Sequence, residues 1–202
     1  MATTTFSGAV RSQGGFTSVS KNSSTGAFTT LSSISSTGVS SFDANTMAVE
    51  AGTGITGGTG TIYRSSVQRV GGIITTRILI DLTGLRSTAS GDIIGVNGTS
   101  NVCHIGQITA ARNGTILTGS MECFEAPAGG DPDINVHSAT EGTGVEDGAI
   151  SSLTETLLVN AGDATLGSKV YFTAVPAADE FLYLTLGDTT DADYTAGKLF
   201  IE

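Results

Sequence analysis

The side chains suited to nucleophilic attack or proton transfer are few: the chain has two cysteines, Cys103 and Cys123, and two histidines, His104 and His137. Because Cys103 and His104 are adjacent, they point to opposite faces of any strand and cannot form a catalytic dyad. The chain also lacks the Gly-x-Ser-x-Gly motif that exposes a nucleophilic serine. We therefore expect no catalytic residues and no enzyme activity.

Two acidic loops could offer oxygen ligands to a calcium ion. One holds Asp131 and Asp133, and the other holds Asp188, Asp191 and Asp193. Neither loop has the alternating ligand pattern, with a glycine at the sharp turn and a terminal glutamate, that makes such a loop specific for calcium. We expect solvated loops with no metal and no cofactor, and calcium binding is the alternative.

A glycine-rich stretch, GTGITGGTG at residues 52–60, has the composition of a phosphate-binding loop. A Walker loop ends in Gly-Lys-Ser/Thr, because the lysine reaches the phosphates and the hydroxyl reaches Mg²⁺. This stretch has no lysine. We expect its glycines to supply positive φ angles at a bend between strands rather than to bind a nucleotide.

Residues 102–124 predict a β-hairpin, because an Asn-Gly pair lies between two apolar-rich runs. A type I turn at Arg112 and Asn113, with Gly114 in the left-handed position, would form a three-residue loop with a G1 bulge. This register sorts mostly apolar residues onto one face. It pairs Cys103 with Cys123, Ile105 with Met121, Thr109 with Leu117, Val102 with Phe124, His104 with Glu122, and Ile108 with Thr118.

Two of these pairs have chemical consequences. His104 and Glu122 would form a cross-strand ion pair. Cys103 and Cys123 would lie close enough for a disulfide, but two reduced, buried thiols are what we expect of a protein made in a cytoplasm.

Short β-rich runs separated by turn residues continue along the chain, and no segment has a helical period. The run at residues 72–82 is apolar enough for a central strand that is buried on both faces. Residues 126–149 form a long loop region with two Pro and several Gly. The fold class is therefore all-β, an antiparallel β-sandwich or jelly roll. Its further strands are expected at residues 46–50, 61–70, 92–96, 155–160, 169–174, 181–186 and 197–202.

The first 45 residues differ in composition from the rest. Residues 1–42 contain no acid, are rich in Ser, Thr and Gly, and carry scattered apolar residues. Such a segment cannot bury enough apolar surface to fold alone. We expect an extended N-terminal arm at residues 1–45 that becomes ordered on another surface, followed by a β-sandwich domain at residues 46–202; a disordered tail is the alternative.

The charged residues are also distributed unevenly along the chain. Residues 1–90 have six basic and three acidic residues, for a net charge of +3, whereas the remainder has three basic and 16 acidic residues, for −13. The acidic half argues against nucleic acid as a partner, because phosphates require Lys or Arg. The basic half suits an acidic protein surface.

The sequence predicts no membrane association. No run approaches the ~18–20 apolar residues that span a bilayer, and the N-terminus lacks the basic and then apolar layout of a signal peptide. Synthesis in a cytoplasm is the expectation.

Several sequence blocks together are distinctive: TTTFSG (residues 3–8), AGTGITGGTGT (51–61), IDLTGL (80–85), CHIGQI (103–108), EAPAGG (125–130), the segment 142–156 and YTAGKLFI (194–201). They resemble a family of small virion structural proteins of marine tailed bacteriophages, and the likeness spans nearly the whole chain. Members tend to have Pro where Ala9 stands.

The resemblance implies a non-enzymatic particle component, and an acid-free arm before an acidic β-domain looks like a capsid decoration or cement protein. Such a protein would bind the major capsid protein on the capsid surface as a homotrimer, with the arm against the shell and with one face of the 72–82 sheet in the subunit interface. The residues expected in capsid or subunit contacts are Phe6, Phe16, Phe28, Leu31, Ile34, Arg64, Arg69 and Arg77.

A tail fibre or spike subunit is the alternative function. Its long loop at residues 126–149 and its acidic loop at residues 188–193 would recognise a glycan on the host surface. The long loop has no aromatic residue to stack on a sugar ring, which favours decoration.

Overall fold

The structure is a computed structural model that describes residues 15–34, 40–42 and 48–202. The chain divides into two compact units, Met1–Met47 and Ala48–Glu202. No helix in the described residues is long and apolar enough to cross a membrane.

The described part of the first unit is a three-stranded antiparallel sheet. Its strands β1 (Phe16–Lys21), β2 (Phe28–Ile34) and β3 (Ser40–Phe42) lie in sequence order. The β1–β2 turn is fixed by Asn22, whose side-chain oxygen accepts hydrogen bonds from the backbone N–H groups of Ser24 and Thr25. Within its described residues, the predicted arm therefore folds back on itself.

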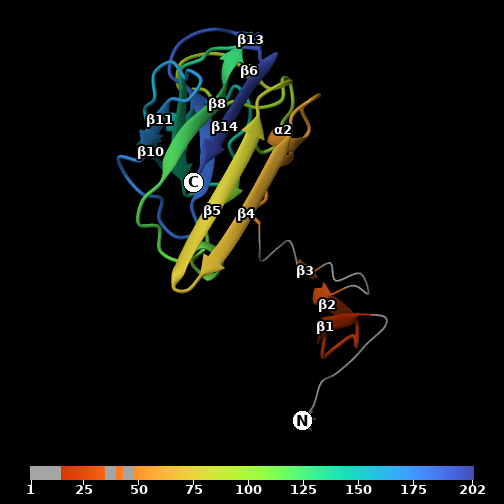
Figure 1. Cartoon of the computed structure of the whole chain (residues 1–202). Helices are drawn as coiled ribbons and strands as arrows, with labels where there is room; N and C mark the ends of the chain where they lie inside the picture. Colours follow the sequence, from red (N-terminus) through yellow and green to blue (C-terminus); the bar gives the residue numbers. More distant parts are fainter. Residues whose placement is uncertain (1–14, 35–39, 43–47) are drawn as a thin grey trace. The chain divides into compact units, whose positions relative to one another are not determined.

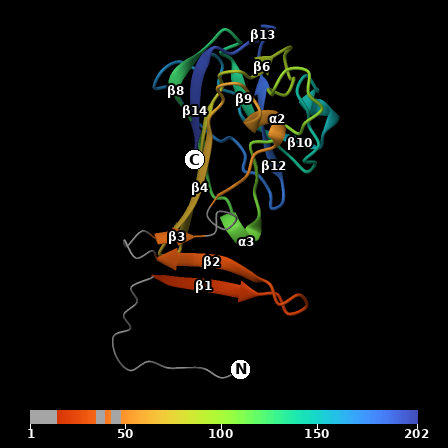
Figure 2. The same cartoon turned by 90° about the vertical axis from the view of Figure 1, so that its right-hand side faces the viewer.

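The second unit is an antiparallel β-sandwich, as predicted, with two layers visible in Figures 1 and 2. Consecutive strands often change sheet, as they do in Greek-key and jelly-roll sandwiches. One sheet has the order β11-β8-β14-β5-β4 and the other the order β10-β9-β12-β7, and a short pair β13-β6 lies at one end of the sandwich. The strands are β4 (Tyr63–Val70), β5 (Ile73–Asp81), β6 (Arg86–Ser87), β7 (Gly106–Gln107), β8 (Ser120–Ala128), β9 (Ile134–Ala139), β10 (Glu155–Val159), β11 (Lys169–Tyr171), β12 (Phe181–Leu186), β13 (Ala192–Asp193) and β14 (Ala196–Ile201).

Strand β5 is an interior strand of the five-stranded sheet, between β4 and β14. Its alternation places Ile78 and Ile80, at most 1% exposed, in the core between the sheets. On the opposite face, Ile73 is 73% exposed and Arg77 is exposed. The prediction of burial on both faces therefore does not hold within the single chain.

The centre of the core is the pair β9 and β12. All six residues of β9 are buried, as are five of the six in β12. One face of this pair meets the five-stranded sheet, and the chain around residues 140–153 covers the other face. Tyr183 anchors that cover, because its hydroxyl donates a 2.7 Å hydrogen bond to the carbonyl oxygen of Glu141.

The predicted hairpin at residues 102–124 is wrong. Residues Ala110–Asn113 form a helical turn, α3, and Gly114, with φ of 68°, is its C-cap. The left-handed glycine thus ends a helix rather than a hairpin loop. The two flanking runs then separate, because β7 pairs with β12 in one sheet and β8 pairs with β14 and β11 in the other.

Three further expectations need correction. The loop region 126–149 contains the buried strand β9. Residues 92–96 make isolated bridges rather than a strand. Of the expected strand at residues 46–50, positions 46 and 47 lie outside the described residues, and the rest is not a strand.

The glycine-rich loop also differs from its prediction. Residues Thr53–Thr56 form a helical turn, α2. Gly60 has a positive φ, as expected, but Gly54 is required for close approach: a β-carbon there would lie 2.3 Å from the Cys103 sulfur.

Candidate interaction site

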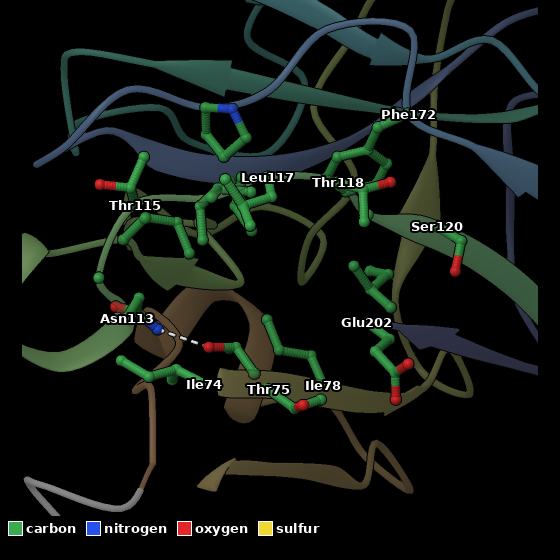
Figure 3. Close-up of a pocket in the computed structure, with 18 of the residues that line it drawn as sticks. Ile74, Thr75, Ile78, Asn113, Thr115, Leu117, Thr118, Ser120, Phe172 and Glu202 are labelled. Carbon is green, nitrogen blue, oxygen red and sulfur yellow. Dashed lines mark hydrogen bonds between the residues drawn. The ribbon is translucent and has the colours of Figure 1, made fainter. Parts of the chain in front are cut away.

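An apolar pocket of about 590 Å³ opens at the end of the sandwich that holds the β4–β5 turn. This end is called the pocket end below. Figure 3 shows the pocket between the β5 residues Ile74 and Ile78 on one side and the loop residues Leu117 and Thr118 on the other. Phe172 closes one flank, and Leu182 of β12 and Ile201 of β14 also line the cavity. The pocket therefore lies between the two sheets, where the core is incompletely filled.

The loop wall of the pocket is held by α3. Thr109 is the N-cap of this turn, and its hydroxyl accepts a hydrogen bond from the Arg112 N–H. Asn113 is buried, and its side-chain amide donates a 2.8 Å hydrogen bond to the Thr76 hydroxyl on β5, while its side-chain oxygen accepts one from the Thr109 N–H. These bonds fix the 114–119 loop opposite β5.

The mouth of the pocket is surrounded by exposed apolar side chains. Ile73, Leu117 and Tyr171 line it and are 73%, 86% and 66% exposed. Val70, which pairs with Ile73 at the end of the β4–β5 hairpin, is 67% exposed. Clusters of exposed apolar side chains are typical of interaction surfaces. We call Val70, Ile73, Leu117 and Tyr171 the pocket rim.

The structure brings the three predicted arginines together on one hairpin. Arg64 and Arg69 lie on β4 and Arg77 lies on β5, and all three are exposed. Arg77 donates a 2.7 Å hydrogen bond to a carboxylate oxygen of Glu202. By strand alternation Arg64 and Arg77 face outward from the sandwich, whereas Arg69 shares the face of its register partner Ile74.

The aromatic and aliphatic residues predicted for contacts lie in the first unit. Phe16 in β1 and Phe28 in β2 are 46% and 67% exposed. Leu31 and Ile34 also belong to β2. Phe6 lies outside the described residues.

The predicted ion pair of His104 with Glu122 is wrong, because His104 lies outside the strands, in the segment before β7, whereas Glu122 lies on β8. His104 packs against Phe181 with ring centroids 5.0 Å apart, and burial lowers the pKa of its imidazole. Glu122 instead faces Lys169 at 3.5 Å. His137 is the histidine with a carboxylate partner: its Nδ1 lies 2.7 Å from Glu155 across β9 and β10.

Both cysteines are free and buried. Burial raises the pKa of the Cys103 thiol to about 11, and it also raises the pKa of Cys123. The Cys103 sulfur fits between Gly54 and Gly95, where a β-carbon at either position would come within 2.3 Å of it. These surroundings give the thiols a role in packing and keep them protonated at neutral pH.

The two predicted acidic loops meet at the opposite end of the sandwich, beside β6 and β13, which is called the acidic end below. Asp131 is 3% exposed, and its carboxylate accepts 2.9 Å hydrogen bonds from the backbone N–H groups of Asp133 and Thr190. Burial, together with Asp131, Asp163 and Asp188, raises the pKa of Asp133. Within the described residues, no group of three or more acidic, His or Cys side chains is arranged to hold a metal ion.

A polar depression of about 460 Å³ also lies toward the acidic end. Glu146 and Asp147 line it from the predicted long loop, and Asp191 lines it from the second acidic loop. Arg86 stands beside them and pairs with Asp191 at 2.8 Å and with Asp193 at 2.9 Å. Asp147 has a φ of 63°, which is uncommon for a residue other than glycine.

Sequence reasoning missed the pocket. The predicted hairpin places Leu117 on a paired strand. Ile116 and Leu117 nevertheless form an isolated apolar pair in a Thr- and Gly-rich stretch, a signal that indicates an exposed loop. Comparisons of the chain with protein-family models, with curated proteins and with solved structures found no match.

Proposed function

We propose that the chain is a non-enzymatic virion structural protein that decorates and stabilises an assembled phage capsid. Its partner is the major capsid protein, and it sits on the capsid surface as a homotrimer after synthesis in the host cytoplasm. The proposal joins the family resemblance of the sequence to the distribution of apolar and charged groups over the sandwich.

The observation that carries the proposal is the asymmetry of the second unit. The pocket end offers an apolar pocket with an exposed rim, next to the hairpin that carries Arg64, Arg69 and Arg77. The two acidic loops, which hold Asp131 and Asp133 and residues 188–193, meet at the other end. A protein that attaches by one end and presents a charged, soluble end to solvent needs this division.

The outer face of the five-stranded sheet supports the trimer. Phe124 and Phe200 stack there with centroids 5.2 Å apart, and Phe124 is 48% exposed. Arg64 and Arg77 lie on the same face. An aromatic pair flanked by arginines has the composition of a subunit interface.

The stabilising mechanism is thermodynamic. A protein that binds the assembled shell, and not its dissociated subunits, shifts the equilibrium toward the shell by mass action. The acid-free N-terminal region adds to this attachment, because it carries Arg11 and Lys21 and no acid before Asp43.

Cryo-electron microscopy of intact particles tests this function. Density for the chain as trimers on the three-fold axes of the shell is the expected result, and density in the tail with none on the shell would overturn it. A chain that lacks residues 2–42 should keep its thermal transition and lose particle attachment. Loss of the transition would instead assign those residues to the core of the domain.

A host-binding tail fibre or spike subunit is the second candidate, and the polar depression favours it. Both loops expected to bind a glycan contribute to that depression, through Asp147 and Asp191, and Arg86 and Asn97 add hydrogen-bond donors. A glycan array probed with the wild-type chain and with Asp147→Ala tests this function. Binding that the substitution abolishes would favour the fibre over the decoration protein.

A further inference from the structure

The surface around the pocket is larger than the pocket itself. Ile73, Leu117 and Tyr171 line the mouth, but Val70 and Val175, which are 67% and 46% exposed, lie outside the cavity beside lining residues. A small ligand inside the cavity would leave these side chains in water. The apolar area therefore fits a protein segment that fills the pocket with one side chain and covers the rim with its neighbours.

Two arginines without a salt bridge lie on segments next to lining residues, and among the described residues the one carboxylate that lines the pocket, Glu202, is paired with Arg77. Arg69 pairs in register with Ile74, which lines the pocket, and Arg112 directly precedes Asn113, which also lines it. In the part of the chain that the structure describes, neither arginine makes a salt bridge. Four other basic residues of this unit do so: Arg77, Arg86, Lys169 and Lys198.

Because cations are scarce in this unit, the two arginines restrict the choice of partner. Residues 48–202 have seven basic and 18 acidic residues, for a net charge of −11. A polyanion such as nucleic acid would be repelled by the unit as a whole. A short segment with one or two carboxylates beside an apolar side chain can instead place those carboxylates against the arginines alone.

We propose that the pocket docks an acidic segment of a partner protein, which inserts one aromatic or branched aliphatic side chain between Ile78 and Leu117 and sets a carboxylate against Arg69 or Arg112. The docking site rests on the proposed function, in which the shell provides that segment. The docking site adds to that function the side chains that the segment must carry, an apolar side chain and a carboxylate.

The test is selection of a displayed library of random 12-residue peptides on the full chain, with Leu117→Glu as a parallel target. Leu117 is exposed, so this substitution adds a charge to the rim without removing a core contact. Leu166→Glu is the matched control, because Leu166 is 73% exposed and does not line the pocket. Equal midpoints of thermal unfolding for both variants and the wild type verify that the fold is intact.

We expect the enriched peptides to combine an aromatic or branched aliphatic residue with Asp or Glu within three positions. A synthetic copy of the most enriched peptide should bind Leu117→Glu and the double variant Arg69→Glu/Arg112→Glu at least tenfold more weakly than it binds the wild type. It should bind Leu166→Glu and Arg64→Glu as tightly as the wild type. Peptides without acids, or equal binding to all variants, would overturn the proposal.

Two further measurements separate this site from its alternatives. If sedimentation shows that the wild type self-associates and that Leu117→Glu does not, the occupant is a second copy of the chain and the proposal is wrong. If wild-type chain attaches to particles and Leu117→Glu attaches equally well, the docking site fails while the decoration function stands. If the wild type does not attach, the decoration function fails, and the peptide selection alone decides the docking site.

Discussion

The two ends of the sandwich differ in which side chains they bury and which they expose. At the acidic end, Asp131 and Tyr194 are 3% and 1% exposed, and the Tyr194 hydroxyl donates a 2.7 Å hydrogen bond to the Asp131 carbonyl oxygen. Polar groups there hold loops from distant parts of the sequence together. At the pocket end, apolar side chains are left open to solvent around a cavity. The loops at the acidic end are therefore joined by hydrogen bonds, whereas apolar side chains at the pocket end stay exposed.

The clearest comparison is between Ile78, a buried side chain that lines the pocket, and Ile73 on the pocket rim. Ile78→Ala removes a side chain that is 1% exposed, and we expect a loss of about 3 kcal/mol in the free energy of unfolding. Ile73→Ala, on the same strand but 73% exposed, should change it by less than about 0.5 kcal/mol. Chemical denaturation measures both. A comparable loss in the two variants would mean that the rim contributes to folding.

At the acidic end, Asp131→Ala should cost about 2 kcal/mol, because it leaves the N–H groups of Asp133 and Thr190 without their carboxylate acceptor. The matched control is Asp188→Ala in the neighbouring loop, where the side chain is exposed. Denaturant unfolding measures the free energy of unfolding of both variants. If Asp131→Ala were as stable as the control, the loops would be held by something other than this carboxylate.

Tyr194→Phe tests a single hydrogen bond at the acidic end. Removing the hydroxyl leaves the ring in place and deprives the Asp131 carbonyl of its 2.7 Å donor, so we expect a loss of about 1 kcal/mol. Tyr171→Phe removes a hydroxyl from a 66% exposed ring at the pocket end and should have no measurable effect. Thermal unfolding compares the two, and a loss in Tyr171→Phe of equal size would contradict the division between the ends.

Substitution of Asp133 should have the smallest effect on stability, and unlike the other substitutions it should stabilise the fold at pH 7. Burial, with the charges of Asp131, Asp163 and Asp188, raises its pKa, so the folded state holds the proton more tightly than the unfolded state does. Its contribution to stability therefore grows as the pH falls through the raised pKa, and levels off below about pH 4, the ordinary value for Asp.

Asp133→Asn removes this titration. The thermal midpoint at pH 7 should rise slightly above that of the wild type, and the difference should vanish as the pH approaches 4. A variant that is less stable than the wild type at pH 7 would show that the Asp133 carboxylate stabilises the acidic end in its charged form.

Local sequence signals were reliable where one strand carries its own pattern. Residues 181–186 were predicted as a strand with the bounds that β12 has, and residues 72–82 contain β5 as an interior strand. The all-β class followed in the same way, because alternating β-branched runs between turn residues have few other stable arrangements. The acidic character of the loops was also evident, since charge can be counted along the chain.

The predictions that depended on contacts with distant segments of the chain were wrong. Asn113 and Gly114 suit a hairpin turn and a helix C-cap equally well. In the helical turn that forms, the Asn113 amide donates a hydrogen bond to the hydroxyl of Thr76, 37 residues away. The Pro and Gly residues of 126–149 predict a loop, yet β9 lies within this region and carries Asn135, His137 and Ser138 among apolar residues. These polar side chains are buried only because other segments cover both faces of the strand.

The sequence by itself determined the fold class and the strands that carry their own alternating pattern, because these depend on local periodicity. Only the tertiary structure decided which strands pair, that the two acidic loops share one end, and that Ile74 and Leu117 face each other across a cavity. Those features join residues far apart in the chain, and local chemistry does not encode which distant segment will supply the missing contact.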